Sequence, residues 1–122
     1  MANVPKITPD GPRRVLPVTG YTLALSWSPE FCKPRKDDRA HPVQCSGKNG
    51  SFGLVVHGLW PESGSSWPQW CEAGAALTPS DIRGSMCISP SQRLIARQWA
   101  KHGSCMVTRP AQYFKVTRIL WE

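Results

Sequence analysis

The stretch Ser-Phe-Gly-Leu-Val-Val-His-Gly-Leu-Trp-Pro, residues 51–61, organises the interpretation of the whole chain. Phe52, Leu54 and Val56 alternate with the residues between them, a period of two that predicts a β-strand. His57 stands at the end of this strand, on the face opposite those three side chains. The glycine and proline that follow are expected to end the strand. A rigid strand end suits a general acid or base, because such groups lose rate when misplaced.

A second histidine lies on a predicted helix downstream. The segment Ser89-Pro90-Ser91-Gln92 has the form of a capping box with proline at the first helical position. Gly103 is a natural end for this helix. Between them, Ile95, Trp99 and His102 fall on one face, at spacings of four and three residues. A lone strand histidine is more often a core residue bonded to backbone, and the second histidine shifts the balance towards catalysis.

Two histidines and a neighbouring lysine suit RNA cleavage without a metal. RNA carries its own nucleophile, the 2′-OH, so an enzyme needs a base, an acid and a cation for the charged phosphorane. His57 and His102 suit the first two tasks, because histidine has an ordinary pKa of about 6.5. Lys101 supplies the cation. DNA lacks the 2′-OH and would not be cleaved.

The length, the net charge and the cysteine content limit the classes to which this protein can belong. The chain has 122 residues, which suits one domain, and its net charge of +7 favours a polyanionic partner such as RNA. No apolar run is long enough to span a membrane. Five cysteines in so short a chain indicate an oxidising compartment, so a periplasmic or secreted protein is expected. We expect a monomer that needs no cofactor.

The remaining segments predict an α+β fold with helices packed on an antiparallel sheet. Residues 1–20 hold four prolines and form an extended lead-in to a domain at 21–122. Alternating Tyr21, Leu23, Leu25 and Trp27 predict a half-buried strand that pairs with the strand at 51–60. A short helix should begin at Thr78-Pro79-Ser80-Asp81. A last helix should begin at Pro110, with Tyr113, Val116 and Leu120 as its apolar stripe.

Two segments resemble the active-site motifs of a known family. His57-Gly-Leu-Trp-Pro61 and Trp99-Ala-Lys-His-Gly-Ser-Cys105 resemble those of the ribonuclease T2 family of acid-type endoribonucleases. The resemblance runs from about Tyr21 to the end of the chain and fits a bacterial-type member. It implies metal-independent cleavage of single-stranded RNA through a 2′,3′-cyclic phosphate, with little base preference.

The resemblance also assigns roles to individual residues. His57 and His102 match the catalytic pair, with His102 taken as the base and His57 as the acid. Lys101 matches the lysine that stabilises the transition state, and Trp60 matches an aromatic that stacks on a substrate base. Arg97 is a candidate phosphate ligand.

The chain departs from the family pattern in two places. The family usually has His-Glu-Trp where this chain has Arg97-Gln98-Trp99. A glutamine at position 98 carries no charge, so the catalytic role expected there would be weaker, and Gln98→Glu is expected to raise kcat about tenfold, or roughly 1.4 kcal/mol of barrier. Family domains also continue further, so we expect the C-terminal strands of the sheet to be missing.

The resemblance implies a disulfide between Cys71 and Cys105, and a second pair, Cys32–Cys45, is expected. Cys87 is then left over. Two other functional classes stay open. One is a relative that binds RNA without cleaving it, and the other is a zinc site made of both histidines and a cysteine.

Overall fold

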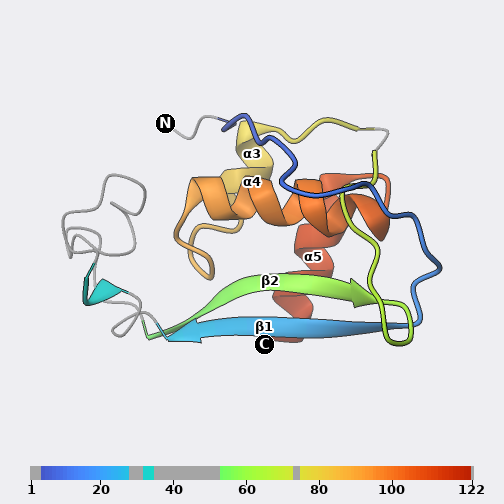
Figure 1. Cartoon of the computed structure of the whole chain (residues 1–122). Helices are drawn as coiled ribbons and strands as arrows, with labels where there is room; N and C mark the ends of the chain where they lie inside the picture. The colour runs from blue at the N-terminus through green and yellow to red at the C-terminus, as the bar shows by residue number, and fades with distance from the viewer. Residues whose placement is uncertain (1–3, 28–31, 35–52, 73–74, 122) are drawn as a thin grey trace.

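The computed structural model describes residues 4–27, 32–34, 53–72 and 75–121 (Figure 1). Strands β1 (Gly20–Trp27) and β2 (Leu54–Glu62) form an antiparallel sheet. The helices lie on one side of that sheet: α3 (Pro79–Arg83), α4 (Gln92–Lys101), the 3₁₀ turn η1 (Gly103–Cys105) and α5 (Pro110–Trp121). The predicted α+β class and the antiparallel pairing of the two strands are confirmed. None of the described helices is long and apolar enough to cross a bilayer.

Strand β2 does not end at the glycine after His57, as the sequence suggested. It continues to Glu62, which pairs with Gly20 of β1. Instead of ending, the strand shifts its register: Ala24 faces Gly58 and Leu25 faces Val56, so His57 has no partner in β1. Such a bulge bends the strand and redirects one side chain. The histidine is therefore set apart by an irregularity inside the strand.

The alternation predicted for β2 is also wrong. Val55 and Val56 are both buried, whereas Leu54 is 51% exposed. The backbone N–H of Val56 donates to the carbonyl of Ile88 at 2.7 Å, so the loop before α4 lies against β2 here. Phe52 lies outside the described residues.

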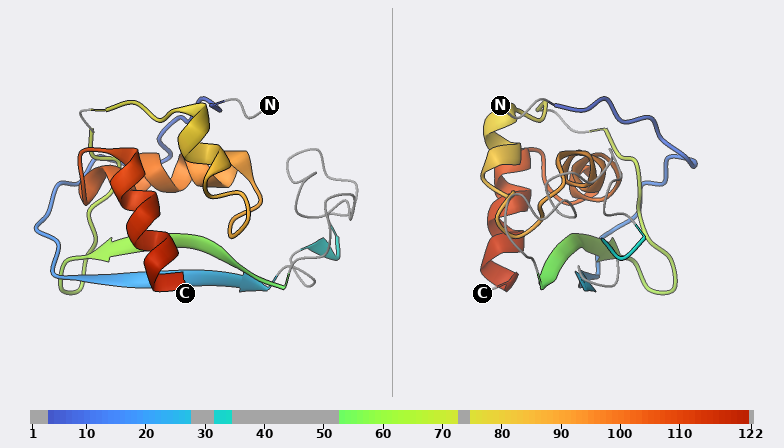
Figure 2. Two further views of the ribbon diagram at one scale, coloured as in Figure 1. Left: turned by 180° about the vertical axis from the view of Figure 1, so that it is seen from behind. Right: turned by 90° about the vertical axis from the view of Figure 1, so that its left-hand side faces the viewer.

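Strand β1 has the predicted position but a different burial. Only Leu23 of its apolar residues packs on the core. Tyr21, Leu25 and Trp27 are 45–59% exposed. Figure 2 shows α5 crossing the sheet near the middle of β1, so this helix leaves both ends of the strand uncovered.

Local signals place the helix starts. Thr78 caps α3, as predicted, and it also forms a capping box with Asp81. Helix α4 begins two residues later than expected, because the N-cap is Ser91, whose hydroxyl accepts from the N–H of Leu94. No carboxylate or amide stands at the position that would complete a box there. The predicted cap at Ser89 is wrong.

Helix α5 begins at Pro110 as expected, but its buried stripe differs. Tyr113, Phe114 and Thr117 are buried, whereas Val116 and Leu120 are 41% and 51% exposed. The core joins residues of β2 and the three helices: Leu59, Ile82, Ile95, Trp99, Tyr113 and Phe114.

The N-terminal segment runs along the outside of the helical layer before it enters β1 (Figure 2). It makes a bridge to the loop after β2, in which Arg14 and Gln69 exchange backbone hydrogen bonds of 2.9 and 3.0 Å. The extended lead-in is therefore held against the domain.

Candidate active site

His57 lies in the bulge of β2, and helix α5 fixes the strand close to it. Two residues further along the strand, the hydroxyl of Tyr113 donates to the carbonyl of Leu59 at 2.9 Å and accepts from its N–H at 3.2 Å. This single buried side chain satisfies both backbone groups that β2 turns away from β1 at that point. The strand on either side of Leu59 is thus fixed, and with it His57 and Trp60.

His102 is the C-cap of α4. Its backbone N–H donates to the carbonyl of Gln98 at 2.9 Å, which is the last bond of the helix. Next comes Gly103, where a Cβ would lie 2.5 Å from the Trp99 ring and 2.8 Å from that of Tyr113. A glycine is required here because α5 approaches this closely. The turn that orients His102 therefore depends on tight packing as well as on helix termination.

The loop after β2 is tied to the same end of α4. The N–H of Trp70 donates to the carbonyl of Lys101 at 2.8 Å. Cys71 and Cys105 form a disulfide with 5.0 Å between their Cα atoms, as predicted. Both contacts join the loop after β2 to the end of α4 that carries Lys101 and His102.

Trp60 stands between the two histidines. Its ring stacks on that of His102, with centroids 5.5 Å apart and planes 29° from parallel. The ring of His57 meets it edge to face at 5.6 Å. The two histidines predicted from separate motifs are thus brought together against one indole.

Gln98 lies behind this indole and is not among the residues that line the cavity beside Lys101 and His102. Its Oε1 accepts from Nε1 of Trp60 at 2.8 Å, and the residue is only 4% exposed. A Cβ on residue 58 would lie 1.9 Å from the same oxygen, so Gly58 leaves the room that Gln98 fills. Residue 98 stands four positions before His102 and three before Lys101, a spacing that predicts a shared cleft. This prediction is wrong, because the Gln98 side chain turns inward to Trp60.

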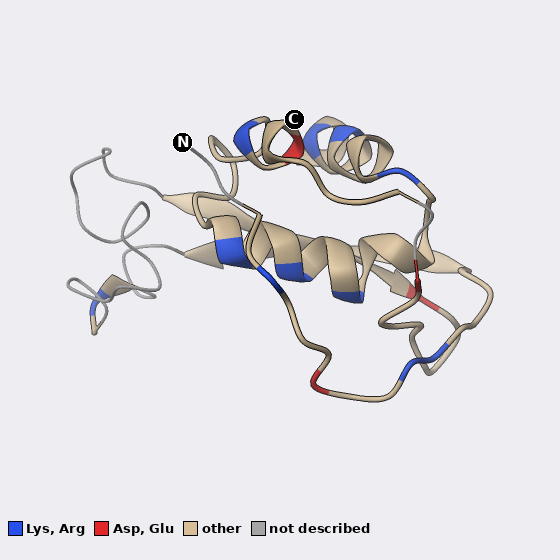
Figure 3. Ribbon diagram, turned by 90° about the horizontal axis from the view of Figure 1, so that it is seen from above, with Lys and Arg blue, Asp and Glu red and all other residues tan. Residues whose placement is uncertain are grey.

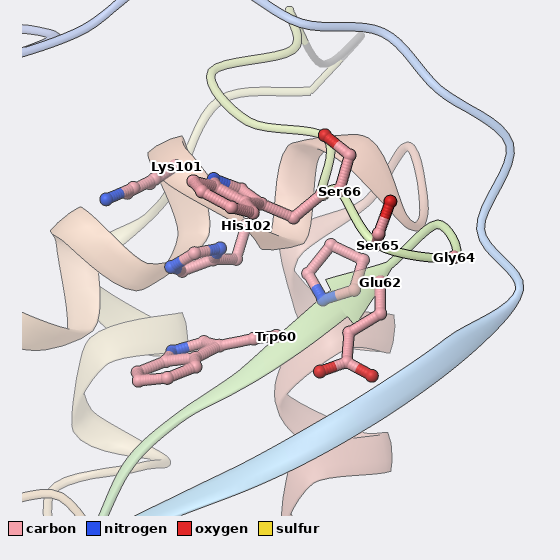
Figure 4. A pocket seen from close by; sticks show the side chains of 9 residues that line it. Trp60, Glu62, Gly64, Ser65, Ser66, Lys101 and His102 are labelled. Carbon is pink, nitrogen blue, oxygen red and sulfur yellow. The ribbon is translucent and has the colours of Figure 1, made fainter.

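A cavity of about 390 Å³ opens beside these residues (Figure 4). One end holds Lys101 and His102, with the ring of Trp60 beneath the imidazole. The other end is formed by the turn after β2: Glu62, Gly64, Ser65, Ser66 and Trp67. The cavity thus combines a cation, a titratable ring and aromatic surface, as a nucleotide site requires.

The environment lowers the pKa of both histidines. Burial lowers the pKa of His102 to about 4, with further contributions from the positive charges of Lys101, His57 and Arg97. The pKa of His57 is lowered less, first by burial and then by Arg97. The Nδ1 atoms of both rings are buried and have no hydrogen-bond partner among the described residues. Such shifts are typical of groups that work in acid–base chemistry.

Arg97 lies at the border of this cluster. Its Nη2 is 2.6 Å from Oδ2 of Asp10, and its guanidinium is 5.5 Å from the centroid of Trp70. The bond from Arg97 lowers the pKa of the Asp10 carboxyl. The contact between Arg97 and Asp10 was not predicted, because the sequence offers no local signal for a contact between residues so far apart.

Cysteine chemistry argues against the zinc alternative. Cys71 and Cys105 are bonded to each other in a disulfide, and Cys32 is disulfide-bonded as well. Its expected partner, Cys45, lies outside the described residues, so that pairing stays a prediction. Cys87 is free and exposed. No cluster of three or more His, Cys, Asp or Glu suited to a metal occurs in the described part of the chain.

Comparison with known proteins agrees with this geometry. The model of the ribonuclease T2 family matches residues 18–122. The chain belongs to the ribonuclease T2 family. Its relatives include a "Probable ribonuclease" of Haemophilus influenzae, 38% identical over 110 residues that cover 80% of this chain and 40% of the relative. A ribonuclease of Aeromonas hydrophila is 39% identical over 85 residues, which cover 70% and 36%.

A solved structure shows the same fold. Trichomaglin, an S-like ribonuclease, is 28% identical with a TM-score of 0.63, over 83% of this chain and 58% of its own. The chain therefore spans less than two thirds of the length of these ribonuclease T2 relatives. The segment that the family model matches contains both histidine motifs and the Cys71–Cys105 bridge.

Proposed function

We propose that this ribonuclease T2 domain is a metal-independent endoribonuclease. It cleaves single-stranded RNA with little base preference, acts as a monomer and leaves DNA intact. The observation that supports this most is the placement of His57 and His102 against the Trp60 indole, with His102 and Lys101 lining the cavity beside it. These are the base, acid and cation that intramolecular attack by the 2′-OH requires.

The different sizes of the two pKa shifts suggest which histidine plays which part. A general base must be neutral and a general acid protonated in the same molecule. His102, with its pKa near 4, is neutral over most of the acidic range, whereas His57 keeps its proton to higher pH. We therefore assign His102 to remove the 2′-OH proton and His57 to protonate the departing 5′ oxygen. The products are a 2′,3′-cyclic phosphate and a free 5′-OH.

Other residues of the site contribute binding and charge. Lys101 stabilises the two negative charges that gather on the phosphorane oxygens. Trp60 offers its free ring surface to a base, in addition to holding both histidines, and Arg97 binds a neighbouring phosphate. Base stacking makes no demand for a particular hydrogen-bond pattern, which fits low base specificity.

The direct test uses an RNA dinucleotide in the presence of a chelator. Formation of the 2′,3′-cyclic phosphate is followed by chromatography, with a matched substrate that carries 2′-deoxyribose at the cleavage position. Cleavage of the ribose substrate alone supports the mechanism. Cleavage of both substrates, or its loss in chelator, would refute it.

A second candidate is an RNA-binding protein without turnover. The neutral Gln98 in place of the family's acidic residue favours it, and the same assay decides, since this protein would bind RNA and yield no cyclic phosphate. With either function we propose a periplasmic or secreted location, because the Cys71–Cys105 bridge needs an oxidising compartment.

A further inference from the structure

A row of basic side chains leads away from the catalytic cluster along helix α4. Arg93, Arg97 and Lys101 stand four residues apart, so they occupy successive turns on nearly the same face. Figure 3 shows the Lys and Arg positions of α4 along one side of the helix. Each step of four residues advances about 6 Å along the axis. The row is therefore long enough to meet more than one phosphate.

One end of this row belongs to the active site. Lys101 lines the cavity together with His102. The charge of Arg97 lowers the pKa of both histidines, so it acts at the same cluster. Arg93 is exposed, and no carboxylate of the described segments lies within ion-pair distance of it. An anion that leaves the cavity past Lys101 would meet Arg97 next and then Arg93.

The middle of the row already binds an anionic group of the chain itself. Asp10 places a carboxylate oxygen 2.6 Å from Arg97, and its side chain is 56% exposed. Arg97 is thus oriented to bind an oxyanion on the outer side of α4. A solvent-exposed ion pair contributes little stability, so a phosphate that carries further contacts can displace this carboxylate.

We propose that Arg93, Arg97 and Lys101 form a phosphate track for single-stranded RNA that extends beyond the cleaved bond, and that Asp10 competes with RNA for Arg97. The proposal takes the identity of the ligand from the proposed function. It adds a length requirement, because only an RNA longer than a dinucleotide reaches Arg93.

The experiment measures binding and avoids cleavage. Fully 2′-O-methylated RNA has no free 2′-OH to attack, and its dinucleotide and decamer are compared by competition with a fluorescent decamer at several salt concentrations. Arg93→Gln should lower the preference for the decamer over the dinucleotide about three- to tenfold. It should also reduce the salt slope of decamer binding by about 0.7, the value for one phosphate contact to a single strand. Asp10→Asn should raise decamer affinity by a few fold.

Lys115→Gln on α5 is the matched control, since it removes the same charge from an exposed position on another helix. Equal losses in Arg93→Gln and Lys115→Gln would overturn the track, because only net charge would then matter. So would an Asp10→Asn variant that binds the decamer no better than the wild type. Because no step requires cleavage, a protein that binds as expected but yields no cyclic phosphate would refute the proposed function and leave the track standing.

Discussion

The two histidines of the site are mounted on different structures. His57 is an unpaired residue in the bulge of β2, whereas His102 caps the C-terminal end of α4. A helix C-terminus by itself favours a charged imidazole, by about 0.3–1 kcal/mol at exposed sites. Yet the pKa of His102 falls to about 4, so burial and the positive charge of Lys101 outweigh the helix.

This difference underlies the two roles that we propose. The pKa of the histidine on the strand stays closer to the ordinary value, and the pKa of the histidine at the helix end is lowered further. In the proposed mechanism these different surroundings make one side chain the acid and the other the base. The Trp60 ring contacts both histidines, and Gln98 behind it accepts a hydrogen bond from the indole. These contacts fix the position of the strand histidine relative to the helix histidine.

The largest expected effect comes from removing either histidine. His57→Ala and His102→Ala should each lower kcat on a dinucleotide on the order of 10²-fold or more, because each deletes one proton transfer. Product formation is measured at the optimum pH of the wild type. If one variant kept full activity, the two histidines would not both be catalytic.

The support behind Trp60 should matter next. In Gly58→Ala the new Cβ would collide with Gln98 and displace the acceptor of the Trp60 indole. We expect about 1–3 kcal/mol of destabilisation from overpacking, and a loss of kcat of about tenfold. Urea unfolding and dinucleotide kinetics measure the two effects.

Gly20→Ala is the control for this variant, because nothing lies within 4 Å of a Cβ at the start of β1. Its stability and kcat should match the wild type. A Gly58→Ala protein as active as Gly20→Ala would show that the position of Trp60 does not depend on Gln98.

The Gln98→Glu variant tests how a nearby charge affects the pKa values of the two histidines. A carboxylate would still accept from Trp60, and its negative charge would favour the protonated forms of the nearby histidines. The acidic limb of the pH–rate profile should therefore move to higher pH. We also expect kcat to rise about tenfold. An unmoved limb and an unchanged kcat together would mean that residue 98 only positions the indole.

A smaller effect is expected in the pH dependence of stability. Between pH 6.5 and about 4, His102 binds a proton in the unfolded chain but not in the folded one, so stability must fall as the pH falls through this window. The loss is at most about 3 kcal/mol and is less where water reaches the ring. Urea midpoints at pH 7 and pH 4 should differ less in His102→Gln than in the wild type. Equal differences in the two proteins would mean that the pH dependence of stability comes from a group other than His102.

Local patterns in the sequence predicted most elements and the residues that meet. The positions of both strands were predicted from alternation, although the buried faces that it assigned were wrong, and α3 and α5 were predicted from their proline starts. The two motifs led to His57, His102 and Lys101, and the family resemblance to the Cys71–Cys105 bridge. These signals succeed because each depends on neighbours in the chain.

Features that depend on distant partners were not predicted. The bulge at His57 is a property of the register between β1 and β2, which neither strand reveals alone. The inward turn of Gln98 depends on the Trp60 indole and on the space left at Gly58. The Asp10–Arg97 pair joins residues 87 positions apart. The exposure of Trp27 likewise reflects what lies over the sheet.

The measurement that tests the central claim most directly is the pH dependence of kcat/KM on an RNA dinucleotide, which reports the free enzyme. With His102 as base and His57 as acid, the profile should be bell-shaped, with an acidic limb near pH 4 and an alkaline limb below about 6.5. Its maximum should lie between these values, and chelator should leave it unchanged. A rate that keeps rising above pH 7 would contradict the assignment, because a protonated His57 would then be dispensable.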